Sequence, residues 1–241
     1  MGIEYDGTAY NGWQKQNVGT GIQSVVEDAV SEVADKKIDV ICAGRTDSGV
    51  HANEQSAHFD CKNKISQTIR FLKSINHFLR KEGISILKVK KKNDNFHARF
   101  SARIRIYKYI IINRLSAPVI EKNRSWHVIK KLDLELMRKG AKKLIGTKDF
   151  STFRSSSCRA KSPIRTMKLV TIKSSKNKIE IEFRSQSFLQ QQVRSMVGCL
   201  KYLGEKKWSL KKFENIIKLK KRGLCAPPAP PEGLYLKRVI Y

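Results

Sequence analysis

One aspartate stands among small residues in the segment "CAGRTDSGVH", residues 42–51. Gly44 and Gly49 enclose four residues, as in the first half of the phosphate-binding pattern G-x-x-x-x-G-K-[ST]. Val and His follow where that pattern needs Lys and Ser or Thr, and a carboxylate inside the loop would repel a phosphate. The segment therefore does not predict a nucleotide site. Asp47 is either a functional acid or a residue that bonds its own turn or caps a helix.

A second set of residues that could do chemistry lies in "RIRIYKYIII", residues 103–112. Side chains alternate between the two faces of a strand, so one face carries Arg103, Arg105, Tyr107 and Tyr109. Such a face could hold phosphates and stack a base. The alternative is that the tyrosines are there because tyrosine forms strands well.

Arg194, in "FLQQQVRSMVG", is the only charged residue between Phe188 and Leu200. It lies at the edge of an otherwise apolar helical stripe. There are two alternatives. The aliphatic part of the side chain runs along that stripe and the charge reaches water, or the guanidinium binds a specific anion. A carboxylate is the favoured anion.

The cysteine and histidine spacings do not predict a metal centre. The five cysteines are odd in number and never closer than 19 residues, which argues against a disulfide framework and suits a reducing cytoplasm. The one candidate metal set is Asp47, His51, His58 and Asp60, and ordinary polar positions explain these residues more simply. We therefore expect no bound metal.

The charge of the chain indicates a polyanionic partner. Lys and Arg number 49 against 21 Asp and Glu, a formal net charge of +28. Such an excess opposes compaction through self-repulsion, and nucleic acid is the favoured partner. An anionic membrane surface is second, but no apolar run is long enough to span a bilayer. The alternative is that the lysines only solvate the surface.

The elements that must position these residues follow a repeated order. In the first half we expect a capping box at residues 20–23, helices after residue 20 and over about 65–80, and strands at 2–7, 37–43, 54–60 and 84–90. In the second half we expect helices over about 133–145, 188–203 and 209–221, and strands at 103–112, 166–173, 178–184 and 234–241. The pattern predicts an α+β protein of two tandem ferredoxin-like halves, residues 1–101 and residues 102–241, the second with an additional helix.

Seven motifs, in order, resemble those of the tRNA pseudouridine synthase A (TruA) family, over residues 3–241. They are "YDGTAYNGWQKQ", "GRTDSGVHA", "HFD", "FHARFSARIRIYKY", "DFSTF", "FLQQQVRSMVG" and "PPEGLYL". The resemblance implies an isomerase that converts uridine to pseudouridine at positions 38, 39 and 40 of the tRNA anticodon stem-loop. It also implies a cytoplasmic homodimer that needs no metal or organic cofactor. The two halves would join into one mixed, mostly antiparallel sheet with a central cleft.

The resemblance also assigns roles to particular residues. Asp47 would be the catalytic aspartate, Tyr107 the tyrosine that packs on the target base, and Arg194 the basic partner of the aspartate. Leu234 would form the apolar wall of the pocket, and Arg45 would take the place of the flipped-out base. The alternation of the strand, and not the resemblance, adds Tyr109, Arg103 and Arg105 as expected substrate-binding residues beside Tyr107.

The chain departs from the family pattern at a few positions. Ser48 stands where alanine is usual, and residues 190–192 are glutamines where histidine and methionine are frequent. None of these changes removes a predicted catalytic residue. Three alternatives remain: a tRNA-binding chaperone without catalysis, a general basic RNA-binding protein, and the same reaction at other uridines.

Overall fold

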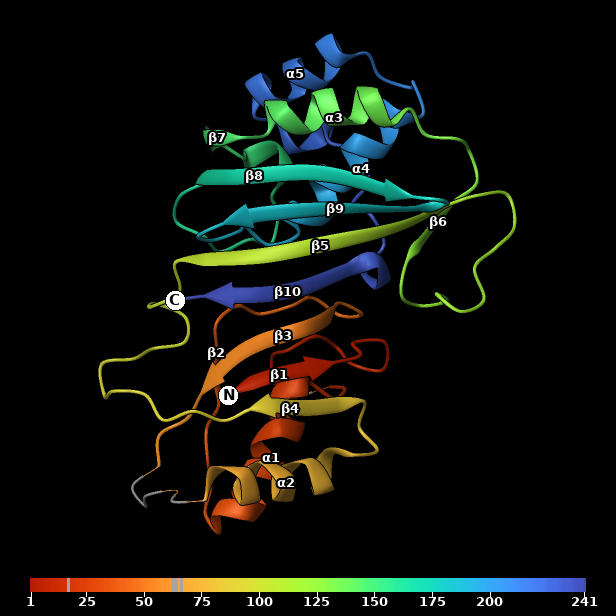
Figure 1. Cartoon of the computed structure of the whole chain (residues 1–241). Helices are drawn as coiled ribbons and strands as arrows, with labels where there is room; N and C mark the ends of the chain where they lie inside the picture. The colour runs from red at the N-terminus through yellow and green to blue at the C-terminus, as the bar shows by residue number, and fades with distance from the viewer. Residues whose placement is uncertain (17, 62–64, 66) are drawn as a thin grey trace. The chain divides into compact units, whose positions relative to one another are not determined.

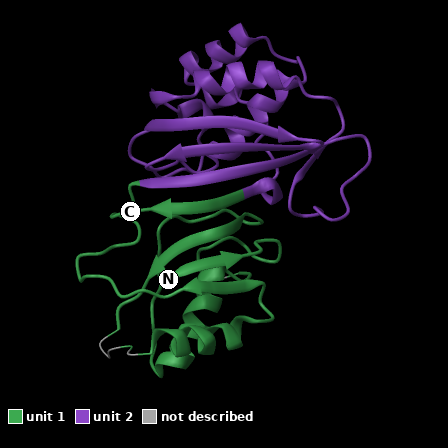
Figure 2. Cartoon of the chain, viewed as in Figure 1, with its two compact units in different colours: residues 1–103, 235–241 green, residues 104–234 purple. Residues whose placement is uncertain are grey.

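The structure, a computed structural model, describes residues 1–16, 18–61, 65 and 67–241. Residues 1–103 cluster with residues 235–241 into unit 1, and residues 104–234 form unit 2 (Figures 1 and 2). The last strand, which the sequence division places in the second half, therefore lies with the first unit. Helices and strands occur in both units, as the α+β prediction requires.

Unit 1 is a mixed sheet in the order β4-β1-β3-β10. The strands are β1 (Gly2–Tyr5), β3 (His51–His58), β4 (Ile84–Lys88) and β10 (Leu234–Ile240), and the short β2 (Ile41–Cys42) pairs with β3. The β4-β1 and β1-β3 pairs are antiparallel, whereas β10 is parallel to β3, with Tyr235 opposite His51. Strand β3 thus pairs with β1, at the start of the chain, and with β10, the last strand.

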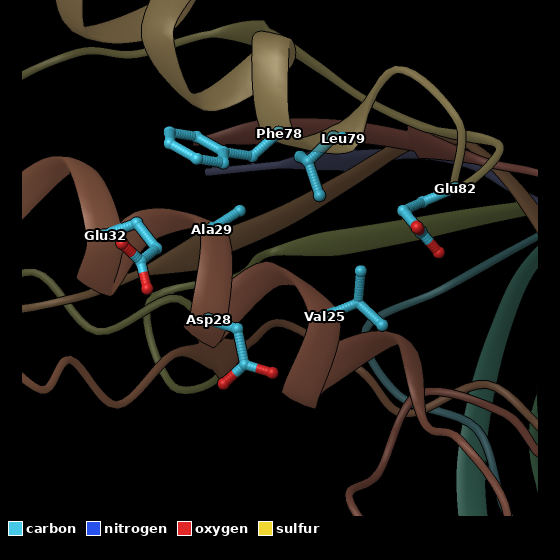
Figure 3. A pocket seen from close by; sticks show the side chains of 7 residues that line it. All are labelled: Val25, Asp28, Ala29, Glu32, Phe78, Leu79 and Glu82. Atoms are coloured by element: carbon cyan, nitrogen blue, oxygen red, sulfur yellow. The ribbon is translucent and has the colours of Figure 1, made fainter.

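Two helices complete unit 1, α1 (Ile22–Ala34) and α2 (Thr68–Leu79), which pack on each other (Figure 1). The buried core includes Val26 and Val30 of α1 and Ile75 of α2. A surface hollow between the helices carries three carboxylates and the half-exposed ring of Phe78, and its lining is Val25, Asp28, Ala29, Glu32, Phe78, Leu79 and Glu82 (Figure 3). It contains none of the predicted site residues, so this hollow and the predicted chemistry do not coincide.

Unit 2 is a sheet in the order β5-β9-β8-β7 with antiparallel neighbours. Its strands are β5 (Ile104–Asn113), β7 (Gly146–Asp149), β8 (Ile164–Ser175) and β9 (Lys178–Ser185), with β6 (Trp126–Val128) parallel to β5. The helices are α3 (Leu134–Lys143), α4 (Gln192–Gly204) and α5 (Leu210–Leu219), and three 3-10 turns are η1 (Ser151–Phe153), η2 (Arg222–Leu224) and η3 (Pro231–Gly233). Side chains cap two of these helices, since Asp133 accepts from the Leu136 N–H and Ser209 from the Lys212 N–H.

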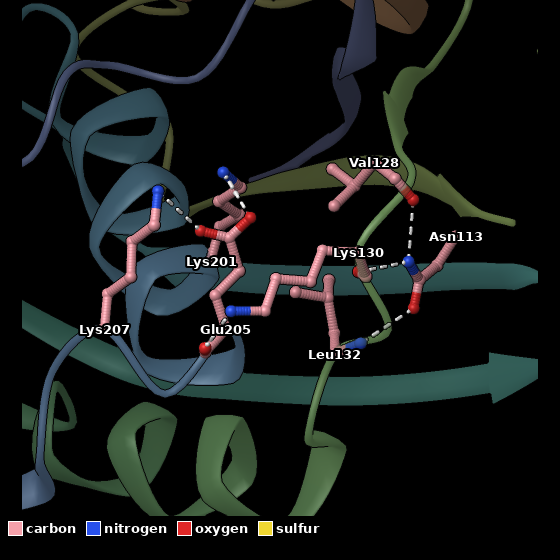
Figure 4. A network of polar contacts seen from close by, with 7 residues as sticks. All are labelled: Asn113, Val128, Lys130, Leu132, Lys201, Glu205 and Lys207. Carbon is pink, nitrogen blue, oxygen red and sulfur yellow. Dashed lines mark hydrogen bonds and ion pairs between the residues drawn. The ribbon is translucent and has the colours of Figure 1, made fainter. Parts of the chain in front are cut away.

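A polar network ties the end of α4 to the chain between β6 and α3 (Figure 4). Glu205 pairs with Lys201 at 2.6 Å and with Lys207 at 3.2 Å, and its backbone carbonyl accepts from Lys130 Nζ at 2.9 Å. Burial raises the pKa of Glu205, but the hydrogen bonds from the two lysines outweigh burial and lower the pKa below its ordinary value. The buried carboxylate is therefore charged and stabilising.

The predicted capping box at residues 20–23 is wrong. The N-cap of α1 is Gly21, and no side chain caps the helix. A Cβ atom on Gly21 would collide with the carbonyl of Gln14, so close chain approach selects glycine here. Gln23 instead accepts from the Lys15 N–H and donates to Glu27 and to the Val40 carbonyl.

The start of α4 is also later than predicted, at Gln192 instead of Phe188. Gln191 has φ of 58°, in the left-handed region, which separates residues 188–190 from the helix. The side chain of Gln192 turns back and accepts from the Leu189 N–H at 2.8 Å. Leu189 is therefore buried in the turn that leads into the helix.

Three further expectations need correction. Helix α2 begins at Thr68, where the prediction began at about residue 65, and Ile69 in its first turn is 72% exposed; residue 66, within the predicted helix, lies outside the described residues. The strand expected at 37–43 is reduced to β2. Strands β6 and β7 were not predicted, because runs of three and four residues are too short to show a period.

Candidate active site

Asp47 lies in the tight loop between β2 and β3. Its backbone carbonyl accepts from the Val50 N–H at 3.2 Å, which closes a turn. Gly49, inside that turn, has φ of 75°, a conformation that glycine adopts without strain. Gly44 acts differently, because its carbonyl accepts from Gln55 Nε2 at 2.7 Å. Asp47 is half-buried and Arg45 is exposed, so both are accessible from solvent.

The segment that follows β1 holds this loop in place. The Trp13 N–H donates to the Thr46 carbonyl at 3.1 Å, and the Tyr5 hydroxyl lies 2.8 Å from Thr46 Oγ1. The Tyr10 carbonyl accepts from the Ser48 hydroxyl at 3.1 Å and from the Gly49 N–H at 3.3 Å. The residues on both sides of Asp47 are therefore bonded to residues 5–13.

Two glycines of that segment allow the close approach. A Cβ atom on Gly12, whose φ is 87°, would lie 2.6 Å from the Thr46 carbonyl oxygen and 3.0 Å from the Asp47 carbonyl carbon. A Cβ atom on Gly7 would collide with the Val50 carbonyl. Neither glycine was predicted to have a role. The only available signal was their presence in "YDGTAYNGWQKQ", which does not show the partner of either residue.

The histidines of the candidate metal set serve the backbone of unit 1. His51 Nδ1 lies 3.0 Å from the Gly7 nitrogen, from which a neutral ring accepts, and 3.2 Å from Asp6 Oδ1, to which a protonated ring would donate. The His51 ring also stacks on Tyr235 with centroids 4.7 Å apart. His58 Nδ1 accepts from the Ala98 N–H at 3.1 Å. Within the described residues, no group of three or more His, Cys, Asp or Glu side chains could hold a metal ion.

Strand β5 in unit 2 is more buried than an open binding face would be. The Tyr107 ring contacts Phe188 edge to face, with centroids 5.0 Å apart. Arg105 is buried, and its guanidinium donates to the Gln186 carbonyl. Tyr109 is fully buried and donates to the Pro230 carbonyl at 2.8 Å. Of the four residues predicted to share a binding face, the fourth, Arg103 at the end of unit 1, is the exposed one.

Arg194 is fixed to the proline-rich segment by its backbone and its side chain. Its Nε donates to the Ala229 carbonyl at 2.7 Å, and its own carbonyl accepts from the Ala229 N–H at 2.9 Å. A Cβ atom on Gly198, one turn further along α4, would collide with the Pro227 carbonyl. The helix and the segment thus pack with no space between them at this point.

Tyr109, Arg194 and Glu232 form one electrostatic group in unit 2. Burial raises the pKa of the Tyr109 hydroxyl, the Glu232 carboxylate raises it further, and Arg194 opposes both. A Cβ atom on Gly233 would lie 2.5 Å from the Tyr109 ring, so only a glycine at this position lets the turn cover the tyrosine. The next residue, Leu234, is also buried. Unit 2 therefore brings Tyr109, Arg194 and Leu234 into one neighbourhood, and unit 1 holds Arg45 and Asp47 on one loop.

Comparison with known proteins agrees with these motifs. The sequence model of a family described as tRNA pseudouridine synthase matches residues 1–101 and 141–241, which include Asp47, Arg194 and Leu234. The chain belongs to this family. The strand that carries Tyr107 lies between the two matched segments.

Relatives match the chain over almost its whole length. The tRNA pseudouridine synthase A of Pelagibacter ubique (strain HTCC1062) is 65% identical over 239 residues, which cover 99% of this chain and 97% of the relative. The enzymes of the same name from Parvibaculum lavamentivorans and Sinorhizobium medicae are 40% and 42% identical, again over 99% of this chain and 97% of each relative. These alignments include β5. Among the described residues, no helix has the length and apolar character needed to cross a bilayer.

Proposed function

We propose that this chain isomerises uridine to pseudouridine in the anticodon stem-loop of tRNA, at positions 38, 39 and 40. The observation that carries the proposal is the Asp47 loop, which is bonded on both sides to residues 5–13 in a chain of the pseudouridine synthase family. A turn aspartate with no chemical role needs no such support from a distant segment. A rigid loop is what an aspartate needs if it must meet a sugar or base in one orientation.

The residue types suit the reaction. Exchanging the C1′–N1 bond for a C1′–C5 bond requires a group that helps to detach uracil and a base for the C5 proton. An ionised Asp47 supplies the first by attack at C1′, by attack on the ring or by removal of a sugar proton. We assign Arg194 as its cationic partner, which keeps the carboxylate ionised when substrate excludes water.

The target base must first leave its stack, at a cost of a few kcal/mol. We assign Tyr107 to stack on the extruded base, Arg45 to fill the gap it leaves, and Leu234 to form the apolar wall of the pocket. The exposed Arg45 suits insertion into RNA. Tyr109 and Arg105 are buried and donate hydrogen bonds to backbone carbonyls. We assign them to hold in position the residues that contact the substrate.

A basic loop, residues 89–103, supplies a surface for the tRNA backbone. Lys90, Lys91, Lys92, Arg99 and Arg103 are exposed there, and the Phe100 ring is 74% exposed with the Arg99 guanidinium 5.5 Å from its centroid. Cations beside an exposed aromatic ring suit a nucleic acid, which offers phosphates and base faces together. We propose that this loop contacts the substrate.

The proposal extends to the assembly and the location of the protein. We propose two ferredoxin-like halves in a single sheet with a central cleft, a homodimer, and a cytoplasmic location without metal or organic cofactor. The homodimer and the cleft rest on the resemblance of the motifs alone. The free cysteines suit a reducing compartment.

The deciding experiment maps pseudouridine in total tRNA from cells that lack the gene and from the same cells carrying the wild-type gene or Asp47→Asn. We expect modification at positions 38–40 to be lost without the gene, restored by the wild type and not restored by the variant. Restoration by Asp47→Asn would refute the assigned role of Asp47. A wild-type protein that binds tRNA but modifies no uridine would support a chaperone.

A further inference from the structure

Two cysteine thiols of unit 2 are in contact. Cys199 lies in the middle of α4, and Cys225 follows the turn η2. Their sulfur atoms are 3.4 Å apart, whereas a disulfide bond is about 2.05 Å long. Both thiols are free. Closing the gap therefore requires a movement of little more than an ångström.

The two thiols differ in their exposure to solvent and in the direction in which their pKa is shifted. Cys199 is fully buried, whereas Cys225 is half-buried. The hydrogen bond from Cys199 lowers the pKa of the Cys225 thiol, and the Arg222 guanidinium lowers it further. That same hydrogen bond, together with burial, raises the pKa of Cys199. Because Cys225 is the more exposed thiol and lies near the Arg222 guanidinium, it is the thiol that peroxide reaches, and Cys199 is the thiol behind it.

We propose that Cys199 and Cys225 form a peroxide-oxidisable pair, in which disulfide closure displaces Arg194. The Cys225 thiolate attacks one oxygen of hydrogen peroxide, the O–O bond breaks, and the products are a sulfenic acid and hydroxide. The Cys199 sulfur then attacks the sulfenic sulfur, the S–O bond breaks, and hydroxide leaves as the disulfide forms. With the Cys199 proton and one from solvent, the two hydroxides become two waters. Two thiols are oxidised by two electrons in all, and one peroxide is reduced.

The disulfide would act on Arg194 through the packing of α4. The chain from Cys225 leads directly to Ala229, whose backbone makes both hydrogen bonds to Arg194. A Cβ atom on Gly198 would collide with the Pro227 carbonyl, so little space is left between helix and segment at this point, and we infer that closure is accompanied by sliding of the segment along the helix. That sliding moves the Ala229 carbonyl away from Arg194 Nε. The thiol chemistry stands by itself, whereas the effect on turnover rests on the proposed function of Arg194.

The test uses the reduced full-length protein, treated with hydrogen peroxide and quenched with an alkylating reagent. Peptide mapping without reductant should show a cross-link between Cys199 and Cys225 and the loss of two thiols. Turnover on tRNA should fall by about tenfold to a hundredfold, the effect expected when a catalytic group moves by about an ångström. Dithiothreitol should restore it.

Two variants make the result specific. Cys225→Ser should retain turnover and resist reversible inactivation, whereas Cys61→Ser, which removes another half-buried thiol, should behave as wild type. Oxidation of Cys225 to a sulfinic acid without the cross-link would refute the proposal that the two cysteines form an oxidisable pair. A complete cross-link with unchanged turnover would overturn its coupling to Arg194. If the reduced wild type modifies no tRNA, the proposed function fails, and the cross-link still decides the thiol chemistry.

Discussion

The backbone N–H of Trp13 donates a 3.1 Å hydrogen bond to the carbonyl of Thr46, the residue directly before Asp47. Trp13 is almost completely buried, so this bond anchors the Asp47 loop to the core of unit 1. Gly12, beside Trp13, approaches the same backbone too closely for any side chain. The position of the aspartate is therefore set by a segment more than thirty residues earlier in the chain.

Replacing Gly12 with alanine should test this anchor. The left-handed φ of 87° and the 2.6 Å approach to Thr46 should together lower the free energy of unfolding by about 1–3 kcal/mol. Turnover on tRNA should fall as well, because relief of the clash moves the Asp47 loop. Gly223→Ala is the matched control, since a Cβ atom there meets no atom within 4 Å. Equal effects of the two substitutions in chemical denaturation and turnover would contradict the anchoring role.

Asp47→Asn should abolish catalysis and spare binding. The amide keeps the size of the side chain but cannot act as an anionic nucleophile or base. We expect no detectable pseudouridine, with tRNA affinity within about tenfold of wild type, a difference of about 1.4 kcal/mol. Filter binding and pseudouridine mapping on one protein preparation measure both. Ser48→Ala, next to it, loses one hydrogen bond to the Tyr10 carbonyl but keeps the one from the Gly49 N–H, so it should remain active. Wild-type turnover by Asp47→Asn would make Asp47 a turn residue.

The exposed phenylalanines offer a paired test of the RNA surface. Phe100→Ala should weaken tRNA binding by about 1–3 kcal/mol through lost base stacking. Phe78→Ala removes a ring that is 50% exposed but lies beside Asp28, Glu32 and Glu82, where a polyanion is repelled. Binding curves at fixed salt should change for the first variant and not for the second. A larger loss of tRNA affinity with Phe78→Ala than with Phe100→Ala would place the RNA-binding surface at α1 and α2 instead.

Glu205→Gln should destabilise the protein in a pH-dependent way. The variant leaves Lys201 and Lys207 without their carboxylate, at a cost of about 1–3 kcal/mol near pH 7. The folded pKa of Glu205 is below its ordinary 4.5, so its contribution is fully present above about that pH. It disappears as pH falls through the lower, folded value. Denaturant unfolding from pH 7 to pH 3 should therefore show the wild-type advantage shrinking, and a constant difference would refute the assignment.

Exhaustive chelation should leave turnover intact. The described residues offer no group of three or more metal-binding side chains, and His51 and His58 contact backbone N–H groups. The assay compares EDTA-treated and untreated protein on tRNA that has been folded beforehand. A loss that one divalent ion restores, with the tRNA still folded, would show that a metal takes part.

Periodicity predicted most of the elements, because burial selects apolar residues at fixed spacing. It failed where backbone conformation decides, as at Gln191, whose left-handed φ delays α4. The same limit applies to the prediction of the candidate site. Asp47 was singled out as a candidate acid from its segment, and its role stays a prediction, but the contact of Gly12 with its loop was not predicted, because that contact joins distant segments. The burial of Tyr109 was also missed, since the cover comes from residues 230–233 and strand alternation shows only which face a side chain is on.

Strand β10 also has a consequence for how the chain folds as it is made. Residues 1–103 leave the ribosome with one side of β3 still lacking its parallel partner. At about 5–20 residues per second, residues 104–234 take roughly 7–26 seconds to follow. During that interval β3 is an open edge, which can pair with a strand of another nascent chain. The half of the protein that holds the aspartate is thus the first to be synthesised and among the last to close.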